Sequence, residues 1–165
     1  MTMFKRIGRA TLALLGGVLI TAATAVPAGA APVTPGTARP AAGCVLMMQQ
    51  PDDLTRTIPV KQVCDATEIR ASGAVALARY YTDADFGGYN QDVYGYYGTC
   101  DKEGYTFSTG DYWSHNLSSY RVFPTCFWST ISTYWGTTRY GTAGDSSYVG
   151  DTWNDNTYTF RTWAR

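Results

Sequence analysis

The chain has 165 residues, and an apolar N-terminal stretch typical of a secretory signal would leave a mature chain of about 135 residues, the size of one domain. The full chain has 13 basic and 13 acidic residues, and removal of Lys5, Arg6 and Arg9 with the signal leaves 10 basic and 13 acidic residues, a net charge of −3. This size excludes a multidomain enzyme, and the negative charge argues against a nucleic-acid binder that depends on phosphate contacts.

The N-terminus has the three parts of a signal peptide. Residues 5–9 are cationic, residues 10–26 are apolar and uncharged, and residues 28–30 are small. We expect cleavage after Ala30, secretion, and no membrane span in the mature chain. The alternative is a membrane anchor, but the apolar run is shorter than the ~20 residues that a spanning helix needs.

Two further segments precede the main part of the chain. Residues 31–43 contain three prolines and no aromatic residue, a composition that predicts a flexible linker. Residues 44–73 carry apolar side chains without a clear period and are interrupted by Pro51 and Pro59. We expect this second segment to form an N-terminal extension closed by a disulfide.

All four cysteines follow the signal, so they would enter an oxidising compartment in which disulfides persist. Three pairings are possible, and the sequence alone does not choose among them. We favour Cys44–Cys64 and Cys100–Cys126, because each of these pairs closes a local loop. The alternative, a zinc site, is disfavoured because no two cysteines are closely spaced and His115 is the only histidine.

From Ala74 onward the pattern predicts an all-β domain over residues 74–165. Residues 75–80 alternate as in a strand, although a short helix is the alternative for so many alanines. Aromatic and β-branched runs then recur between glycine, asparagine and aspartate, at residues 93–97, 105–107, 119–123, 126–135 and 158–163.

The core of this domain must be built mainly of aromatic rings. Of the 24 aromatic residues, all except Phe4 lie between Tyr80 and Arg165, and that stretch has only five Leu, Ile, Val or Met residues: Val93, Leu117, Val122, Ile131 and Val149. Two sheets cannot bury all of these rings. The runs 94–97 and 134–135 would place rings on both faces of a strand, so we expect some to be exposed.

An internal repeat lies at an offset of 40 residues. Residues 110–123 align without gaps on residues 150–163, with identical Gly, Asp, Trp, Asn and Arg positions that include Trp113 and Trp153. Each copy is a polar loop that runs into a strand, which predicts two similar β motifs packed together. The alternative is coincidence in a chain rich in aromatic residues, Ser and Gly.

The chain resembles the βγ-crystallins over about residues 75–165. Tyr81, Phe86 and Gly88 match the signature aromatic-x₄-aromatic-x-Gly that opens a Greek-key motif in that family, and residues 118–119 and 154–155 match parts of its later element. The resemblance implies a two-sheet Greek-key sandwich of two motifs. The second opening signature departs from the pattern, because Trp135 and Tyr140 keep the aromatic spacing but Thr142 stands at the glycine position.

The functional expectation is a secreted, non-catalytic monomer. No serine-hydrolase, zinc-peptidase or phosphate-loop motif occurs. Within the family, a short secreted domain with an N-terminal extension, cysteines and many Tyr and Trp residues resembles the bacterial killer-toxin-like members, which implies an extracellular antagonist of other cells. A secreted peptidase inhibitor and a calcium-stabilised structural envelope protein are the alternatives. Exposed Tyr and Trp predict an extracellular protein or a cell-wall glycan as the partner.

The resemblance also implies where calcium would bind, because the two motifs of calcium-binding members exchange ligands. One exchanged pair is Asp155 with Ser118, which offers a carboxylate and a hydroxyl. The other is His115 with Tyr158, which suits a hard cation poorly. We expect at most one Ca²⁺, bound with an affinity of about 10⁻⁴ to 10⁻³ M. The alternative is that Asp155 and Ser118 only bond to the backbone of their own loops.

Overall fold

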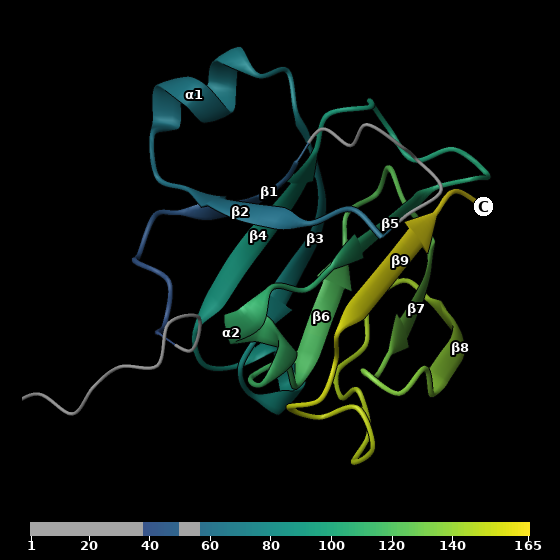
Figure 1. The fold of residues 1–165 in the computed structure, drawn as a ribbon. Helices are drawn as coiled ribbons and strands as arrows, with labels where there is room; N and C mark the ends of the chain where they lie inside the picture. The colour runs from purple at the N-terminus through teal and green to yellow at the C-terminus, as the bar shows by residue number, and fades with distance from the viewer. Residues whose placement is uncertain (1–37, 50–56) are drawn as a thin grey trace, which may run out of the picture. The chain divides into compact units, whose positions relative to one another are not determined.

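The computed structural model describes residues 38–49 and 57–165 (Figure 1). The chain divides into two units, Met1–Ala31 and Pro32–Arg165, and all the described residues belong to the second. The predicted signal, residues 31–37 of the predicted linker and residues 50–56 of the predicted extension lie outside the described residues.

The described residues form nine strands in two sheets (Figure 1). In spatial order, the first sheet contains β2 (Val60–Val63), β1 (Val45–Met48), β4 (Asn90–Gly95), β3 (Val75–Tyr81) and β6 (Ser119–Val122). The second contains β5 (Tyr105–Ser108), β9 (Thr159–Trp163), β7 (Trp128–Ser132) and β8 (Thr138–Ala143). Two short helices, α1 (Ala66–Ala71) and α2 (Asp111–Ser114), complete the elements used below. The predicted all-β class is confirmed.

The two halves of the domain, β3 to β6 and β7 to β9, each place one segment in the sheet of the other half. β5 lies between β4 and β6 in the chain, yet it pairs with β9 in the other sheet. In the opposite direction, Ser146, which lies between β8 and β9, forms an isolated bridge with Tyr120 of β6. Each half therefore completes the sheet of the other, and the two cannot separate without breaking backbone hydrogen bonds.

The buried core between the sheets combines rings with aliphatic side chains. Residues 80–165 contribute mainly rings, as predicted for that stretch, but Leu46, Met48, Ile58 and Leu77, which precede it, are buried in the same core. Phe160 is fully buried and lies 4.9 Å from Tyr120, 5.4 Å from Tyr80 and 5.5 Å from Phe107, measured between ring centroids. Trp113 extends this cluster through Tyr80 at 5.5 Å. Such tilted and edge-to-face pairs stabilise the fold by about 0.5 to 1.5 kcal/mol each beyond the burial of their area.

The N-terminal extension is an integral part of the first sheet. β1 pairs in parallel with β4, and its residues Met47 and Met48 are fully buried. Gln91 of β4 is buried and bridges two regions, because its amide nitrogen donates to the Cys44 carbonyl and its Oε1 accepts from Trp113 Nε1 at 2.6 Å. The extension is thereby fixed to the aromatic core.

Of the predicted linker, residues 38–43 are described, and they lie against the domain. Pro40 is buried, and the Arg39 guanidinium lies 4.4 Å from the centroid of the Tyr89 ring. A cation over a ring at this distance is attracted to the face of the ring. The end of this segment is therefore held to the domain by specific contacts.

The structure contains two disulfides, Cys44–Cys64 and Cys100–Cys126. The first closes the β1–β2 hairpin of the extension. The second joins the connection between β4 and β5 to the connection between β6 and β7, and both of its cysteines are buried. No helix among the described residues is long and apolar enough to cross a lipid bilayer.

Candidate functional site

The 40-residue repeat forms two loops of the same shape, residues 110–118 and 150–158. Each loop begins at a glycine with positive φ, 83° at Gly110 and 92° at Gly150, a conformation that favours glycine. In both loops the amide four residues later donates to that glycine's carbonyl at 2.9 Å, and the loop then runs into β6 or β9. The predicted repeat is therefore also a repeat in three dimensions.

The two loops contact each other at one end of the sandwich. The Asp155 amide donates to the Leu117 carbonyl at 3.2 Å, and the Thr157 amide donates to the Ser114 carbonyl at 3.1 Å. The loops thus bring the ends of both sheets together, and side chains from both motifs share one surface.

The turn after β3, residues 82–89, is a folded hairpin. The Phe86 ring packs edge-on against Tyr81 with centroids 5.6 Å apart, and Ser119 holds the turn, since its Oγ donates to the Asp83 carbonyl and accepts from the Phe86 amide. Gly88 has φ of 71°, and a Cβ there would lie 2.7 Å from the Asp83 Cγ. The predicted signature residues Tyr81, Phe86 and Gly88 thus lie together in one turn.

The equivalent turn after β7 is shorter and contains no folded hairpin. Ser132 pairs with Thr159 as Tyr81 pairs with Ser119, so Ser132 is the equivalent of Tyr81. The turn closes within residues 133–137, where the Thr133 amide donates to the Thr137 carbonyl at 3.0 Å. The expected spacing of Trp135, Tyr140 and Thr142 does not form a second signature, because the last two belong to β8.

This short turn exposes two aromatic side chains. Trp135 is 86 % exposed and Tyr134 is 66 % exposed. The Tyr134 ring lies 5.1 Å from Trp135 on one side and 5.1 Å from Tyr158 on the other, and Tyr158 lies 5.7 Å from His115. We call these four side chains, His115, Tyr158, Tyr134 and Trp135, the aromatic row.

The turn at residues 133–137, which carries Tyr134 and Trp135 of the aromatic row, is held by hydrogen bonds from several directions. The Gly136 amide donates to the Thr133 carbonyl, and the Thr137 amide donates to the Thr133 hydroxyl. From the second repeat loop, Trp153 Nε1 donates to the Thr137 carbonyl at 3.1 Å, and the Tyr158 amide donates to the Ser132 carbonyl at 2.9 Å. The exposed rings therefore project from a fixed backbone.

Trp113 and Trp153, matched in the repeat, have different surroundings. Trp113 is buried and donates to Gln91 in the first sheet. Trp153 is half-buried and supports the turn of the aromatic row. The sequence predicted both as structural residues and did not distinguish their roles.

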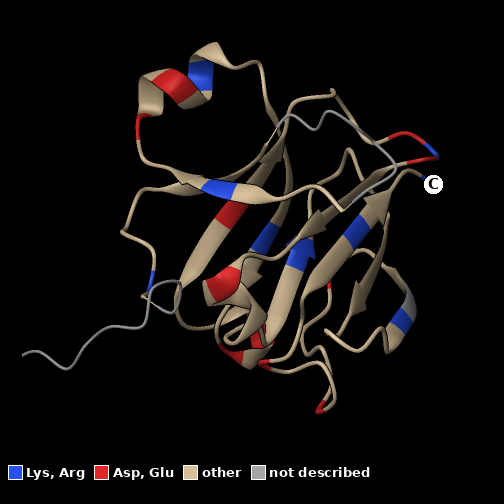
Figure 2. Ribbon diagram, viewed as in Figure 1, with Lys and Arg blue, Asp and Glu red and all other residues tan. Residues whose placement is uncertain are grey.

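The loops at this end of the sandwich carry only negative formal charge. Residues 82–89, 110–118, 133–137 and 147–158 contain no lysine or arginine and five aspartates: Asp83, Asp85, Asp111, Asp151 and Asp155. The Arg121 guanidinium of β6 lies 4.4 Å from the centroid of the Phe86 ring and 3.8 Å from the Asp145 carboxylate, which accepts from the Val122 amide farther along β6. Figure 2 shows acidic positions (red) in loops at the lower end of the sheets, below strands that carry basic positions (blue). We call these four loops the acidic end.

Asp155 links the acidic end to the aromatic row. Partial burial raises the pKa of its carboxyl, while the hydrogen bond from the Asn154 amide and the nearby His115 act in the opposite direction. The His115 Nε2 lies 3.3 Å from the Tyr158 hydroxyl, and its Nδ1 lies 3.0 Å from the Asp111 carbonyl. With the proton on Nδ1, the ring bonds to that carbonyl and accepts from Tyr158.

The residues proposed for calcium lie on adjacent loops, since the Asp155 amide contacts the residue before Ser118. The Ser118 hydroxyl donates to the Thr82 carbonyl at 2.7 Å, and one Asp155 oxygen accepts from the Asn154 amide at 2.8 Å. The buried Asn154 Oδ1 has no hydrogen-bond partner among the described residues. Three oxygens of the type that calcium prefers are thus present, but only Asp155 is anionic. The described residues contain no group of three or more His, Cys, Asp or Glu side chains that could hold a metal.

The His115 and Tyr158 side chains, the other exchanged pair, contact each other directly and form part of the aromatic row. An imidazole that accepts from a phenol offers no anionic oxygen to a cation. The structure therefore gives this pair a place on the surface that the sequence did not predict.

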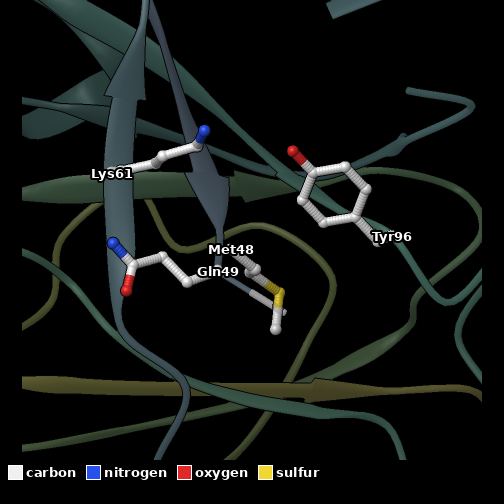
Figure 3. Close-up of a pocket in the computed structure, with 4 residues that line it drawn as sticks. All are labelled: Met48, Gln49, Lys61 and Tyr96. Carbon is white, nitrogen blue, oxygen red and sulfur yellow. The ribbon is translucent and has the colours of Figure 1, made fainter. Parts of the chain in front are cut away.

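A pocket of about 420 Å³ lies at the edge of the first sheet and is lined by Met48, Gln49, Lys61 and Tyr96 (Figure 3). The Lys61 ammonium pairs with Glu68 at 3.1 Å, and the Tyr96 hydroxyl points to the Met47 sulfur at 3.7 Å. Neither group faces a nucleophile or an acid–base partner in this lining.

Comparison of the chain with family models, with curated proteins and with solved structures found no match.

The sequence predicted the exposure of Tyr134 and Trp135 but not their position in the fold. Exposure of the 134–135 run was expected from alternation along a strand, but both residues lie beyond the end of β7, in the turn. The short distance between β7 and β8, together with Gly136, is the signal that could have placed them at a hairpin tip.

Proposed function

We propose that this chain is a secreted, non-catalytic βγ-crystallin-like binding module that acts outside the cell as an antagonist of other cells. The proposal rests first on the two-motif architecture. The exchange of β5 and Ser146 between the sheets, the folded hairpin at 82–89 and the repeated loops all support a Greek-key sandwich of the crystallin type.

The observation that carries the binding function is the exposure of Trp135. Exposing a tryptophan costs hydrophobic free energy that burial would recover, so a fixed turn that displays one at 86 % exposure needs a reason. Rigid Trp and Tyr side chains lose little conformational entropy when they bind, and they are over-represented among the residues that dominate binding energy. We infer that the turn at 133–137 is the contact site for an extracellular partner.

The antagonist proposal is tested with the purified protein added to growing bacteria and fungi. We expect concentration-dependent growth inhibition of at least one organism, and no effect from protein whose disulfides have been reduced and alkylated. Absence of inhibition across both kingdoms would contradict the antagonist role while leaving binding open.

A peptidase inhibitor is the second candidate, and the same turn favours it. A projecting loop with a fixed backbone can enter an enzyme cleft with little loss of entropy, which is how preorganised inhibitors gain affinity. The test is inhibition of purified metallopeptidases and serine peptidases. Inhibition at nanomolar protein that is lost on substitution in residues 133–137 would favour this function over the antagonist.

We propose at most one weak calcium site, with Asp155 and Ser118 as ligands and Asn154 Oδ1 as an available oxygen. When bound, the cation would neutralise the Asp155 carboxylate and join the two repeat loops. Calorimetric titration with Ca²⁺ and thermal unfolding with and without EDTA test it. Two equivalent sites, or binding unchanged in Asp155→Ala, would contradict the proposal. A large stabilisation by calcium would favour the structural envelope role.

A further inference from the structure

The aromatic row and the acidic end together restrict the kind of partner that can dock here. We propose that the aromatic row binds the surface of an uncharged polysaccharide, with Trp135 and Tyr134 stacking on sugar rings. This inference rests on the proposed role as a binding module and specifies the ligand of the same surface.

The first argument is the mixed chemistry of the row. Trp135 and Tyr134 expose ring area, whereas the neighbouring Tyr158 hydroxyl, His115 and the Asp155 carboxylate are polar groups that must stay hydrated or find partners. A purely apolar partner would desolvate these groups without compensation, which costs free energy for each of them. A sugar offers both an apolar C–H face for the rings and hydroxyl groups for the polar atoms.

The second argument is charge. The four loops of the acidic end contain five aspartates and no lysine or arginine, and the one basic side chain of β6 that reaches them, Arg121, already lies close to Asp145 at 3.8 Å. Arg139 is the basic residue next to the turn, and its guanidinium donates inward to Ser146 Oγ at 3.0 Å and to the Tyr148 carbonyl at 2.9 Å. Phosphate-rich or carboxylate-rich polymers and anionic membranes would therefore be repelled. An uncharged polymer would not be repelled by these carboxylates.

The third argument is geometry. The ring centroids of neighbouring members of the row are 5.7, 5.1 and 5.1 Å apart, and each pair is edge-to-face, with interplanar angles of 75°, 65° and 89°. Trp135 and Tyr134 therefore offer faces in different directions, so each can stack on a different sugar ring. Tyr134 and Trp135 project at the tip of the β7–β8 hairpin, so that an extended polymer can contact them without entering a groove. Because the turn backbone is fixed by the Trp153 and Tyr158 hydrogen bonds, little ordering is required on binding.

The test is co-sedimentation of the purified protein with insoluble cellulose and chitin, with carboxymethylcellulose resin as an anionic polymer of the same backbone as cellulose. We expect cellulose or chitin, but not the anionic resin, to deplete the wild-type protein. Raising NaCl from about 0.1 M to about 1 M shortens the Debye length from about 10 Å to about 3 Å. This change should leave binding unchanged, because the polymer is uncharged.

Variants locate the site. Trp135→Ala and Tyr134→Ala should each weaken binding by about tenfold or more, the effect of losing a dominant contact residue. Tyr158→Phe, which keeps the ring, should have a smaller effect. Tyr97→Ala is the matched control, because Tyr97 is also exposed, at 44 %, but lies on the β4–β5 connection. Unchanged thermal unfolding of each variant excludes a folding defect as the cause.

The polysaccharide assignment would be overturned if neither cellulose nor chitin depleted the protein, or if the anionic resin bound it equally well. It would also be overturned if Tyr97→Ala weakened binding as much as Trp135→Ala, or if the protein bound phosphatidylcholine vesicles. Attachment to target cells that disappears after protease treatment of the cells would show a protein partner instead. If Trp135→Ala abolishes growth inhibition although no polysaccharide binds, the proposed function stands and this inference fails. If Trp135-dependent binding occurs without growth inhibition, the reverse holds.

Discussion

The two motifs of the domain use the same turn in opposite ways. After β3, residues 82–89 fold back so that the Phe86 ring packs against Tyr81 and Ser119 holds the backbone. After β7, the equivalent turn closes within residues 133–137 and projects Tyr134 and Trp135 into solvent. The shorter turn thus leaves its rings exposed to solvent, while the longer turn packs its ring against the strand that precedes it.

The largest expected effect concerns the link between the two halves. Replacing Cys100 and Cys126 by serine should lower the free energy of unfolding by about 3 kcal/mol, because the unfolded chain loses a cross-link. The Cys44→Ser, Cys64→Ser protein should lose less, since Cys64 is exposed and this pair closes only the β1–β2 hairpin. Chemical denaturation measures both effects.

Peptide mapping without reduction checks the pairing that underlies this comparison. Recovery of a peptide that links Cys64 to Cys100 would contradict it.

Glycine substitutions should separate the two turns next. Gly88→Ala should cost about 3 kcal/mol, because positive φ disfavours a side chain and the added Cβ would collide with Thr82 and Asp83. Gly136→Ala has the same backbone strain, with φ of 81°, but meets no atom within 4 Å, so its cost should be about 1 kcal/mol. Equal losses would show that the first turn is not the more tightly packed of the two.

A smaller effect is expected from two core tyrosines of the first sheet. The Tyr80 hydroxyl is buried and has no partner among the described residues, so Tyr80→Phe should be neutral or stabilise the fold by about 1 kcal/mol. The Tyr120 hydroxyl lies 2.9 Å from Ser129 Oγ, so Tyr120→Phe should destabilise it by about 1 kcal/mol.

The Tyr80 phenol also predicts a pH dependence. Burial, assisted by the nearby Tyr120, raises the pKa of Tyr80 above its usual value of about 10. Only the unfolded chain then ionises readily at high pH, so stability is complete below pH 10 and falls as the pH rises above it. Tyr80→Phe should reduce this alkaline loss, measured by unfolding between pH 8 and pH 11. An unchanged alkaline slope would contradict the assignment.

The sequence predicted the elements in which pattern and local chemistry agree. Alternation located β3, and the 40-residue repeat located the equivalent loops before β6 and β9. β8 was missed because residues 138–143 are rich in Thr and Gly and carry little hydrophobic signal. The parallel pairing of β1 with β4 joins segments more than 40 residues apart, and no local pattern encodes such a partner.

The site was harder to predict for a related reason. Tyr134 and Trp135 were assigned to a strand, because an aromatic run is typical of one, and only the pairing of Ser132 with Thr159 shows that the strand ends before them. His115 and Tyr158 were considered only as a calcium pair. Their contact with Tyr134 depends on the meeting of the second repeat loop with the β7–β8 turn, which sequence spacing does not specify.

The most direct test of the account compares wild-type protein with Trp135→Ala in two measurements on the same preparations, thermal unfolding and growth inhibition of a sensitive organism. Because Trp135 is almost fully exposed, the substitution should change the free energy of unfolding by less than about 0.5 kcal/mol. We predict that growth inhibition is lost while stability is retained. Full inhibition by the stable variant would contradict the central claim that the turn at 133–137 exists to contact a partner.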